Sequence, residues 1–405
     1  MDTHQTPYFH IEESGLDQDA ALLKNSLTAG WGNFIVGYSV KTNSLPWLLE
    51  YMKRQGFYAE IVSATEYRLA RRIGFPDQHM IYNGPIKEKD VFCRILLAGG
   101  IVNLDSSEEP LWLEELTQQY PERVFSVGVR VNCDIAALCP DEVLVEEEGG
   151  RFGYCYENGK LEEILTRLRS MKGVRLAGLH LHSSTQSRTV TVYAALARMA
   201  VQIARQYSLR LSYVDMGGGY FGGRDDKPDY GDYFPAICQE LRSYFSPEET
   251  VLIAEPGASL ISRATTFVTT VLDIKEIRGR VYLVTDGSRT NLNPLVTRHV
   301  YPHHIEYMTS PEERPLIKSQ WVTGFTCMEY DRLFEIQDGP QLQRGDRIIY
   351  DTAGGYTMCL NPLFIHYFPP VYVTRRDGSL FTARTQWDVE EFIQKNYIEG
   401  GALHE

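Results

Sequence analysis

The chain of 405 residues has no apolar run that approaches the ~20 residues of a membrane-spanning helix. Its first residues, Met1–Pro7, lack the basic and then apolar pattern of a secretory signal. Positive charge is in deficit, because 40 Lys and Arg face 53 Asp and Glu and give a net charge of −13. Such a surface repels phosphate backbones. We therefore expect no membrane and no nucleic-acid partner, although a local cationic pocket for a small anion stays compatible with this charge.

Cysteine is sparse, and its spacing does not indicate a metal site. The seven cysteines include no CxxC pair, and an odd number in a long chain is typical of reduced intracellular thiols. This pattern excludes a zinc ribbon and a disulfide framework, and it predicts a cytoplasmic protein. A nucleotide P-loop of the form GxxxxGK(S/T) is absent as well.

What the chain has instead is an alternation of short apolar runs with helix-like stretches. The runs are rich in Val, Ile and aromatic residues, as buried parallel strands tend to be. The predicted strands are 34–40, 58–62, 79–82, 101–104, 124–131, 174–181, 211–216 and 251–254, and the clearest predicted helices are 46–55, 64–73 and 189–206. Eight strands alternating with helices predict an α/β fold, a (β/α)8 TIM barrel over residues 30–262.

The pattern changes after residue 263, where strand-like runs follow one another without long helices between them. The predicted strands are 266–274, 281–284, 347–350 and 371–373, with turn signals at Asp338–Pro340 and Asp377–Gly378. We predict a second, mostly antiparallel β domain made of residues 263–405 together with residues 1–29, whose segment 7–11 is strand-like. The acidic stretch 133–150 interrupts the barrel, and we expect it to be a solvated loop.

Polar and glycine residues follow the predicted barrel strands. In a barrel of this kind the active site is built at the C-terminal ends of the strands. The segments at these ends are Lys41, Ser63–Glu66, Asn83–Pro85, Arg130, Asn132, His180–Thr185, Gly217–Gly219 and Glu255–Gly257. A barrel with a purely structural role does not require such residues at one end, so the pattern predicts a functional site.

Lys41 is the candidate nucleophile. On an apolar strand an ammonium group is costly unless it is paired or neutralised. A buried lysine with a lowered pKa attacks carbonyl carbons and forms a Schiff base. The alternative is a lysine whose alkyl chain lies along the strand end while its charge reaches water.

The other candidates also have two readings each. Gly217–Gly219 allow backbone N–H groups to close on a monophosphate, or they form a tight turn between strand and helix. Glu255 can pair with a protonated ring nitrogen, or it can cap a helix. His182 by itself is typical of a core histidine, and we expect His180 on the opposite strand face, which excludes a metal site shared by the two. Cys327 by default is a small buried hydrophobe.

Together these segments resemble the pyridoxal-phosphate-dependent decarboxylases of the alanine-racemase-like fold, which include diaminopimelate, ornithine and biosynthetic arginine decarboxylases. The resemblance covers nearly the whole chain in order. Tyr38–Asn43 is similar to the YAVKAN element, His180–Gln186 to HVGSQ, Asp215–Gly219 to DxGGG and Glu255–Gly257 to the start of EPGR, while Cys327 and Tyr356 stand in the places of the family's second-domain cysteine and GAYT tyrosine.

This resemblance implies that pyridoxal 5'-phosphate is the cofactor. Lys41 would hold it as a Schiff base, Glu255 would meet the pyridine nitrogen, and His182 would stack on the ring. The cofactor-binding residues on the phosphate side would be Thr185, Gly217, Gly218, Gly219, Gly257 and Tyr356. Cys327, lent by a second subunit, would return a proton to the substrate after carbon dioxide leaves.

Departures from the family pattern bear on the substrate. Ala258 replaces the arginine of EPGR, so one cationic contact is missing. Met328 stands where ornithine decarboxylases have an acid, with Glu329 one place further on. Arg298 falls at about the place of their second amine-binding acid, and an arginine prefers a carboxylate over an ammonium group. We therefore predict a substrate with a carboxylate or polar distal group rather than ornithine or lysine, bound by Arg298, Glu329 and Arg289, although both arginines also suit an exposed surface.

The resemblance further implies a homodimer with two shared active sites, in which Arg151 and Asp331 resemble a pair that bridges the subunits. Two alternatives remain at this point. A racemase or epimerase of the same fold would return the proton to the other face, and a non-catalytic regulatory homologue would lack the lysine or the phosphate contacts. Cys327 and the Glu255–Gly257 element favour decarboxylation, and no metal is expected.

Overall fold

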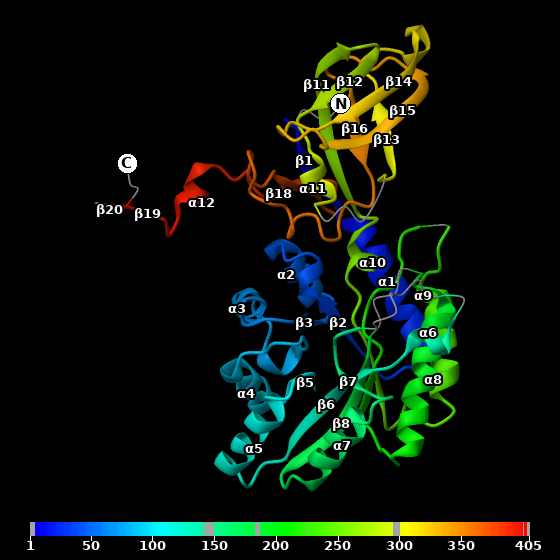
Figure 1. Cartoon of the computed structure of the whole chain (residues 1–405), viewed down its shortest axis with the longest axis vertical. Coiled ribbons are helices and arrows are strands. Elements are labelled where there is room, and N and C mark those ends of the chain that lie inside the picture. Colours follow the sequence, from blue (N-terminus) through cyan, green and yellow to red (C-terminus); the bar gives the residue numbers. More distant parts are fainter. Residues whose placement is uncertain are drawn as a thin grey trace. The chain divides into compact units, whose positions relative to one another are not determined.

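The computed structural model describes residues 5–140, 142, 150–182, 187–224, 226–294 and 300–399, and the backbone of 401 and 402 (Figure 1). The chain divides into two compact units, one of residues 18–260 and the other of residues 1–17 with 261–405. The boundaries that the sequence suggested, at residues 30 and 262, stay a prediction about the domains. Most of the acidic stretch 133–150 lies outside the described residues.

The larger unit is a closed barrel of parallel strands. The order around it is β5 (Ile101–Leu104), β4 (Met80–Tyr82), β3 (Tyr58–Ile61), β2 (Phe34–Ser39), β10 (Val251–Ala254), β9 (Tyr213–Asp215), β8 (Val174–Leu181) and β6 (Phe125–Asn132). Pairing of β5 with β6 closes the ring, and the two-residue strand β7 (Tyr154–Cys155) adds to β6. The predicted (β/α)8 barrel is confirmed.

Helices cover the outside of this barrel, with α3, α4 and α5 on one side of the strands and α8 and α9 on the other (Figure 1). They are α1 (Glu13–Gly30), α2 (Pro46–Arg54), α3 (Ala64–Ile73), α4 (Lys89–Ala98), α5 (Glu109–Gln119), α6 (Ile135–Leu138), α7 (Lys160–Ser170), α8 (Val190–Gln206), α9 (Tyr230–Leu241) and α10 (Ala258–Ile261). Helix α3 illustrates the local reasons for their limits. The Ser63 hydroxyl accepts a hydrogen bond from the Glu66 N–H at its start, and Gly74 ends it in the left-handed conformation.

An apolar layer fills the barrel interior. Ile81, Ala177, Tyr213 and Ile253 form its buried centre, and Ile35, Tyr58, Ile101 and Val251 pack against it. The Tyr213 ring fits because two neighbouring strands carry glycine. A Cβ atom on Gly128 would lie 2.1 Å from the Tyr213 hydroxyl, and one on Gly178 would lie 2.1 Å from the Tyr213 ring.

The smaller unit is a mixed sheet in which most pairs are antiparallel. Its main path runs β15 (Arg332–Pro340), β14 (Leu316–Thr323), β12 (Arg280–Thr285), β11 (Thr265–Ile277), β1 (Tyr8–Glu12), β17 (Val371–Thr374) and β18 (Leu380–Arg384), and β16 (Arg347–Tyr350) joins β11 to β13 (His303–Glu306). Only β1–β17 and β12–β14 are parallel among the pairs described for this sheet. The short helix α11 (Arg289–Leu292) lies between β12 and β13, and the short elements near the C-terminus are α12 (Val389–Ile393), β19 (Tyr397–Ile398) and β20 (Gly401–Ala402).

The predicted mostly antiparallel β domain is therefore confirmed, with one correction of detail. Asp377–Gly378 forms the predicted turn, since Gly378 N–H donates to the Arg375 carbonyl between β17 and β18. The predicted turn at Asp338–Pro340 is wrong, because these residues lie in strand β15, where Gly339 and Pro340 pair with β14 and Asp338, with a φ of +47°, is skipped in the register. None of the helices within the described ranges is long and apolar enough to cross a membrane.

The contact between Gly178 and Tyr213 gives a test of the barrel packing. We expect Gly178→Ala to lower the free energy of unfolding by about 1–3 kcal/mol, because the added methyl group overpacks the interior. Combining it with Tyr213→Leu should cost less than the sum of the two single changes, since the smaller side chain leaves room for the methyl group. Urea unfolding of the four proteins measures this coupling, and strictly additive costs would contradict the packing described.

Candidate active site

A polar layer lies directly above the apolar layer of the barrel. Five strands carry an interior apolar residue and, two places further on, a polar one. The pairs are Tyr58 and Glu60, Ile81 and Asn83, Ile101 and Asn103, Tyr213 and Asp215, and Ile253 and Glu255. Residues two apart on a strand share a face, so the five polar side chains gather at the C-terminal ends of the parallel strands. All five are buried, with at most 5% of each residue exposed.

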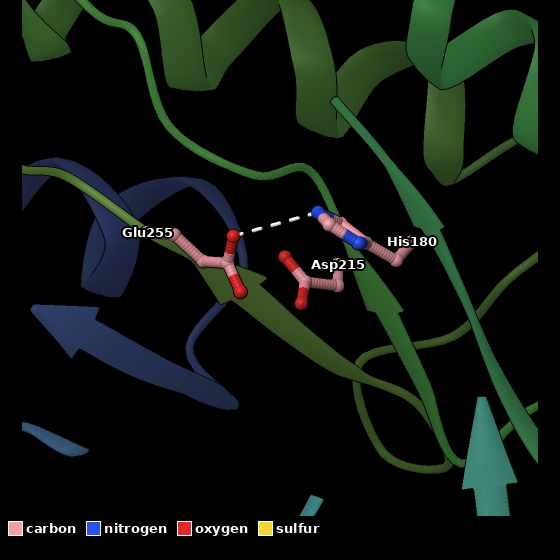
Figure 2. Close-up of side chains that lie close together, drawn as sticks. All are labelled: His180, Asp215 and Glu255. Carbon is pink, nitrogen blue, oxygen red and sulfur yellow. Dashed lines mark ion pairs between the residues drawn. The ribbon is translucent and has the colours of Figure 1, made fainter. Parts of the chain in front are cut away.

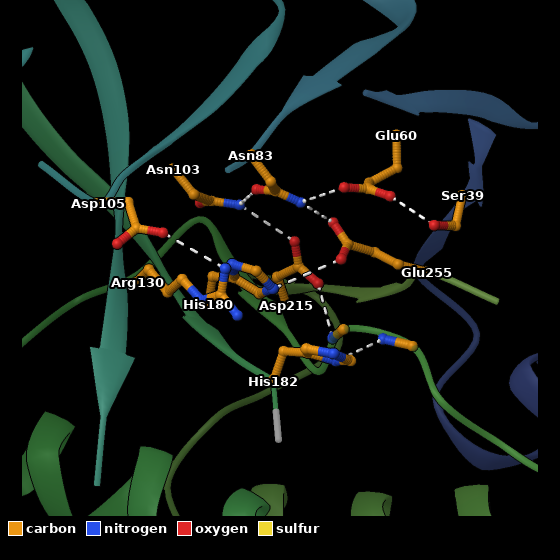
Figure 3. Close-up of polar contacts among 12 residues, drawn as sticks. Ser39, Glu60, Asn83, Asn103, Asp105, Arg130, His180, His182, Asp215 and Glu255 are labelled. Carbon is orange, nitrogen blue, oxygen red and sulfur yellow. Dashed lines mark hydrogen bonds and ion pairs between the residues drawn. The ribbon is translucent and has the colours of Figure 1, made fainter. Parts of the chain in front are cut away.

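Two asparagines connect the carboxylates of this layer (Figure 3). Asn83 Nδ2 donates to Glu60 Oε1 at 3.2 Å and to Glu255 Oε1 at 2.6 Å. Asn103 Nδ2 donates to Asn83 Oδ1 at 2.9 Å and to Asp215 Oδ2 at 3.2 Å. The Tyr213 hydroxyl donates to Asn103 Oδ1 at 2.8 Å and so ties the polar layer to the apolar one. Buried amides that bond on both sides fix the spacing of the acids.

Lys41 lies beside this layer, in a short 3-10 turn (Val40–Thr42) beyond the end of β2. Its Nζ donates to Glu60 Oε2 at 2.7 Å and to Ser39 Oγ at 2.8 Å. The predicted buried amine is wrong: the Lys41 side chain is 41% exposed, and its partner Glu60 is buried. The turn lifts the residue off the strand, so the ammonium group is stabilised by water and by an ion pair.

Glu60 is the functional candidate that sequence reasoning missed. Its carboxylate accepts from Lys41, from Ser39 Oγ at 2.7 Å and from Asn83. The signal was present in the sequence, because Glu60 interrupts the apolar strand 58–62 on the interior face. The same reasoning finds Asn103, which follows Ile101 by two places.

Glu255, Asp215 and His180 form a buried group within the site (Figure 2). One ligand-type atom from each of the three lies within 4.8 Å of the others, and His180 Nε2 is 3.4 Å from Glu255 Oε2. Burial acts to raise the pKa of Glu255, but His180, a hydrogen bond with Asp215 and the charge of Lys41 lower it to about 2. Burial and the adjacent Glu255 raise the pKa of Asp215 well above its usual range.

His182 lies just beyond β8 and faces the glycine turn. Its ring is stacked on that of His180, with centroids 6.3 Å apart and planes at 22°, so the prediction of opposite faces is wrong. Positions two apart on a strand point the same way. Burial, followed by Arg130 and His180, lowers the pKa of His182 to about 3. The ring is therefore neutral at pH 7 and accepts a hydrogen bond from Gly218 N–H through Nδ1 at 3.2 Å.

The turn after β9 can be built only from glycine. Gly217 and Gly219 have φ angles of +62° and +91°, a region that side chains rarely adopt. A Cβ atom on Gly218 would lie 2.1 Å from the Glu255 carbonyl. Its own carbonyl accepts a hydrogen bond from the buried Tyr193 hydroxyl at 2.9 Å.

The turn is not the start of a dinucleotide-binding helix. Gly217, Gly219 and Gly222 fit the spacing GxGxxG, but helix α9 begins only at Tyr230. Its backbone lies instead against Glu255, whose N–H donates to the Gly217 carbonyl at 2.7 Å.

The segment after β10 joins this turn to Lys41. The Ser39 N–H donates to the Pro256 carbonyl at 3.1 Å. A Cβ atom on Gly257 would lie 2.1 Å from Thr42 Oγ1, so only glycine allows the two segments to approach. Glu255 and Lys41 are thereby held at the same end of the barrel.

In the smaller unit, Cys327 lies in the loop between β14 and β15, and its thiol is exposed rather than buried as expected by default. Glu329 is also exposed. Arg289 approaches this loop, since its Nη1 donates to the Tyr330 carbonyl at 3.3 Å. Tyr356 is 42% exposed and has a φ of +59°. Two further predicted residues, Thr185 and Arg298, lie outside the described residues.

Asp331 holds the Cys327 loop together. Its carboxylate accepts four hydrogen bonds, from the Ser288 hydroxyl, the Arg289 N–H, and both the N–H and the hydroxyl of Thr326. A carboxylate has about four acceptor positions, and all four bonds come from residues of the smaller unit. The exposed Arg151 stacks its guanidinium on Phe152. A bridge between Arg151 and Asp331 of two subunits stays a prediction.

Comparison with known families identifies the chain. The family model described as "Pyridoxal-dependent decarboxylase, pyridoxal binding domain" matches residues 18–262. The chain belongs to this family. The family of pyridoxal-phosphate-dependent amino-acid decarboxylases named from the sequence motifs is thereby confirmed.

Individual relatives match over most of their length. The chain is 27% identical over 371 residues to the probable chloroplastic diaminopimelate decarboxylase of Oryza sativa subsp. japonica, covering 89% of this chain and 74% of the relative. It is 24% identical over 375 residues to the L-glutamyl-[BtrI acyl-carrier protein] decarboxylase of Niallia circulans, and the match covers 88% of this chain and 86% of the relative. The crystal structure of diaminopimelate decarboxylase from M. jannaschii shares the fold, with a TM-score of 0.85 at 21% identity over 98% of this chain and 93% of that one.

The neutral state of His182 has a consequence for pH dependence. The folded chain binds fewer protons than the unfolded chain between pH ~3 and the ordinary histidine pKa of 6.5, so this group destabilises the fold as the pH falls through that window. His182→Asn keeps an acceptor for the Gly218 N–H but cannot titrate. We expect its unfolding free energy to fall by about 2 kcal/mol less than that of the wild type between pH ~6.5 and ~4.

Urea unfolding across this pH range measures the difference, with His304→Asn at an exposed histidine of the smaller unit as the matched control. Parallel pH profiles for the wild type and His182→Asn would contradict a neutral His182 with a lowered pKa.

Proposed function

We propose that this chain is an enzyme that binds pyridoxal 5'-phosphate and decarboxylates an amino acid with a carboxylate or polar distal group. The observation that carries the proposal is the joining of an amine, a buried carboxylate and a glycine turn at one end of one barrel. Lys41, Glu60, Asn83 and Glu255 form a continuous hydrogen-bonded path. A merely structural barrel has no need for a buried acid of lowered pKa in that place.

The residues at this end fit the cofactor. The Lys41 amine is accessible for covalent attachment, and Glu255 offers a buried anion for a protonated pyridine nitrogen. Neutral His182 presents an uncharged ring beside the glycine turn. The turn of Gly217, Gly218 and Gly219 carries no side chains, so a phosphate group can approach its backbone closely. When bound, pyridoxal phosphate supplies an electron sink for the electron pair released as carbon dioxide leaves.

The chain's own residues then have separate tasks. Glu60 Oε2, 2.7 Å from Lys41 Nζ, is placed to accept the proton that the amine releases when it attacks an aldehyde carbon. Glu255 keeps the proton on the ring nitrogen, and His182 fixes the ring plane. Thr185, Gly257 and Tyr356 are the further cofactor contacts we assign from the motifs. Cys327 of a second subunit in a homodimer donates a proton to the substrate carbon, as an exposed thiol on an ordered loop can do.

The distal group of the substrate is assigned from charge. Arg289 is tied to the Cys327 loop, and Arg298 stands where ornithine decarboxylases carry an acid. Guanidinium groups bind carboxylates in a bidentate manner, so ornithine and lysine are poor substrates. Relatives named for diaminopimelate and for a carrier-bound L-glutamyl group both act on molecules with such polar ends, free or tethered.

The Lys41 variant tests cofactor attachment. We expect Lys41→Ala to lose the visible absorption of the protein-bound cofactor and all release of carbon dioxide, because no other residue takes the place of the amine. Lys53→Ala, on helix α2 and bonded to the Ile73 carbonyl, is the control that should keep the absorption band.

Assays of carbon dioxide release and of product chirality over acidic and diamino acids of both hands identify the substrate. Racemisation without carbon dioxide would overturn the decarboxylase proposal, and purified protein that binds no cofactor would favour a non-catalytic homologue.

The shared site is tested by mixing inactive subunits. We expect Cys327→Ala to lower kcat by about 10²–10⁴, the range for loss of a positioned general acid. Subunits that carry Lys41→Ala, mixed one to one with Cys327→Ala subunits, should recover about a quarter of wild-type activity, because half of the dimers then hold one intact site of two. Cys359→Ala in the same unit is the control with wild-type activity expected. No recovery after verified subunit exchange would show that Lys41 and Cys327 act within one chain.

A further inference from the structure

Two buried carboxyl groups lie close together at the C-terminal ends of the barrel strands, and the proposed function uses only one of them. Asp215 ends strand β9 and is fully buried, while Glu255 follows β10 and is 5% exposed. One carboxylate oxygen of each lies within 4.8 Å of the other (Figure 2), and each group shifts the pKa of the other, that of Asp215 upward and that of Glu255 downward. Two buried carboxyl groups this close are stable together when one of them carries a proton.

The surroundings decide which carboxyl group is neutral. Glu255 receives a short bond from Asn83 Nδ2 at 2.6 Å, and His180 Nε2 lies 3.4 Å from it. Lys41 also lowers its pKa. Within the described part of the chain, the donors to Asp215 are neutral, Gly217 N–H at 2.9 Å and Asn103 Nδ2 at 3.2 Å. The charged form is therefore better stabilised on Glu255 than on Asp215.

We propose that Asp215 is a positioning residue that holds one proton of the buried acid pair and donates it as a hydrogen bond to Glu255, which stays ionised toward the cofactor nitrogen. This inference rests on the proposed function only for the identity of that cofactor. The pair of acids and its single proton belong to the chain itself. Two ionised carboxylates in contact inside a barrel repel each other strongly, so the proton on Asp215 is what allows Glu255 to remain an anion there.

Other charged and titratable groups face this pair from several strands. Glu60 on β3 raises the pKa of Asp215, and burial contributes more than any neighbour. Tyr213, on the same strand as Asp215, has its own pKa raised by burial and by the two acids. His180 and Lys41 lie on the Glu255 side. The folded chain keeps a proton on Asp215 that the unfolded chain loses above pH ~3.8. The contribution of Asp215 to the free energy of unfolding therefore becomes less favourable as the pH rises above that value.

Infrared spectroscopy of the full chain tests the proton directly. We expect the wild-type protein at neutral pH to show a carbonyl stretching band of a protonated carboxyl group that shifts in D₂O and is absent from Asp215→Asn. Asp105→Asn is the matched control, because Asp105 is ion-paired with Arg130 at 3.3 Å and accepts from the Gly153 N–H at 2.6 Å. The band should persist in that control. A band of equal intensity in the wild type and Asp215→Asn would overturn the proposal.

Cofactor affinity provides the second measurement, by equilibrium dialysis with pyridoxal 5'-phosphate. An asparagine at position 215 can still donate to Glu255 and accept from Gly217, so we expect a loss of only ~3-fold, whereas Asp215→Ala should lose about 10- to 100-fold. Equal losses in both variants would overturn the hydrogen-bond donor role. The two proposals fail separately: retention of cofactor by Lys41→Ala would remove the proposed function, while the infrared band would still decide the state of Asp215.

Discussion

The site depends on the confinement of three carboxylates, Glu60, Asp215 and Glu255, at one buried end of a parallel barrel. Three negative charges in such a medium are unstable unless each is paired, hydrogen-bonded or protonated. Each of the three acids is stabilised in a different way. Glu60 pairs with Lys41, Glu255 is stabilised by Asn83 and His180, and Asp215 is neutral in our proposal. The amides of Asn83 and Asn103 keep the acids apart, so the geometry of the site follows from the need to stabilise its charges (Figure 3).

The barrel places these groups through the two-residue period of its strands. The apolar layer around Tyr213 and Ile253 fixes the height at which the polar layer begins. Glycines at 128 and 178 admit the Tyr213 ring, and the Tyr213 hydroxyl then holds Asn103. A side chain needed for core packing thus also orients an amide that touches Asp215. Packing and site chemistry are coupled through this one phenol.

Much of the barrel could be predicted because buried parallel strands are continuous apolar runs. The ranges 101–104, 174–181 and 251–254 agree residue for residue with β5, β8 and β10. Strands β14 and β18 of the smaller unit were not predicted. Their polar and apolar residues are mixed and many of their side chains are partly exposed, so they do not form continuous apolar runs. Asp338 with Gly339 signalled a turn, and Asp338 does adopt a φ of +47°, yet the pairing of Gln337 and Gly339 with β14 keeps the segment in a strand. Local turn preference is weaker there than the hydrogen bonds of the sheet.

The site was predictable in its motifs and less so in its electrostatics. Sequence placed Lys41 correctly by strand but treated its environment as apolar, because a 3-10 turn after β2 could not be read from the residues. The amine of a lysine whose side chain is 41% exposed does not become nucleophilic through loss of water. Its reactivity must come from a proton acceptor at hydrogen-bonding distance, and Glu60 is placed to accept. The acid that the motif comparison left unassigned therefore replaces burial as the physical basis for lysine chemistry in this barrel.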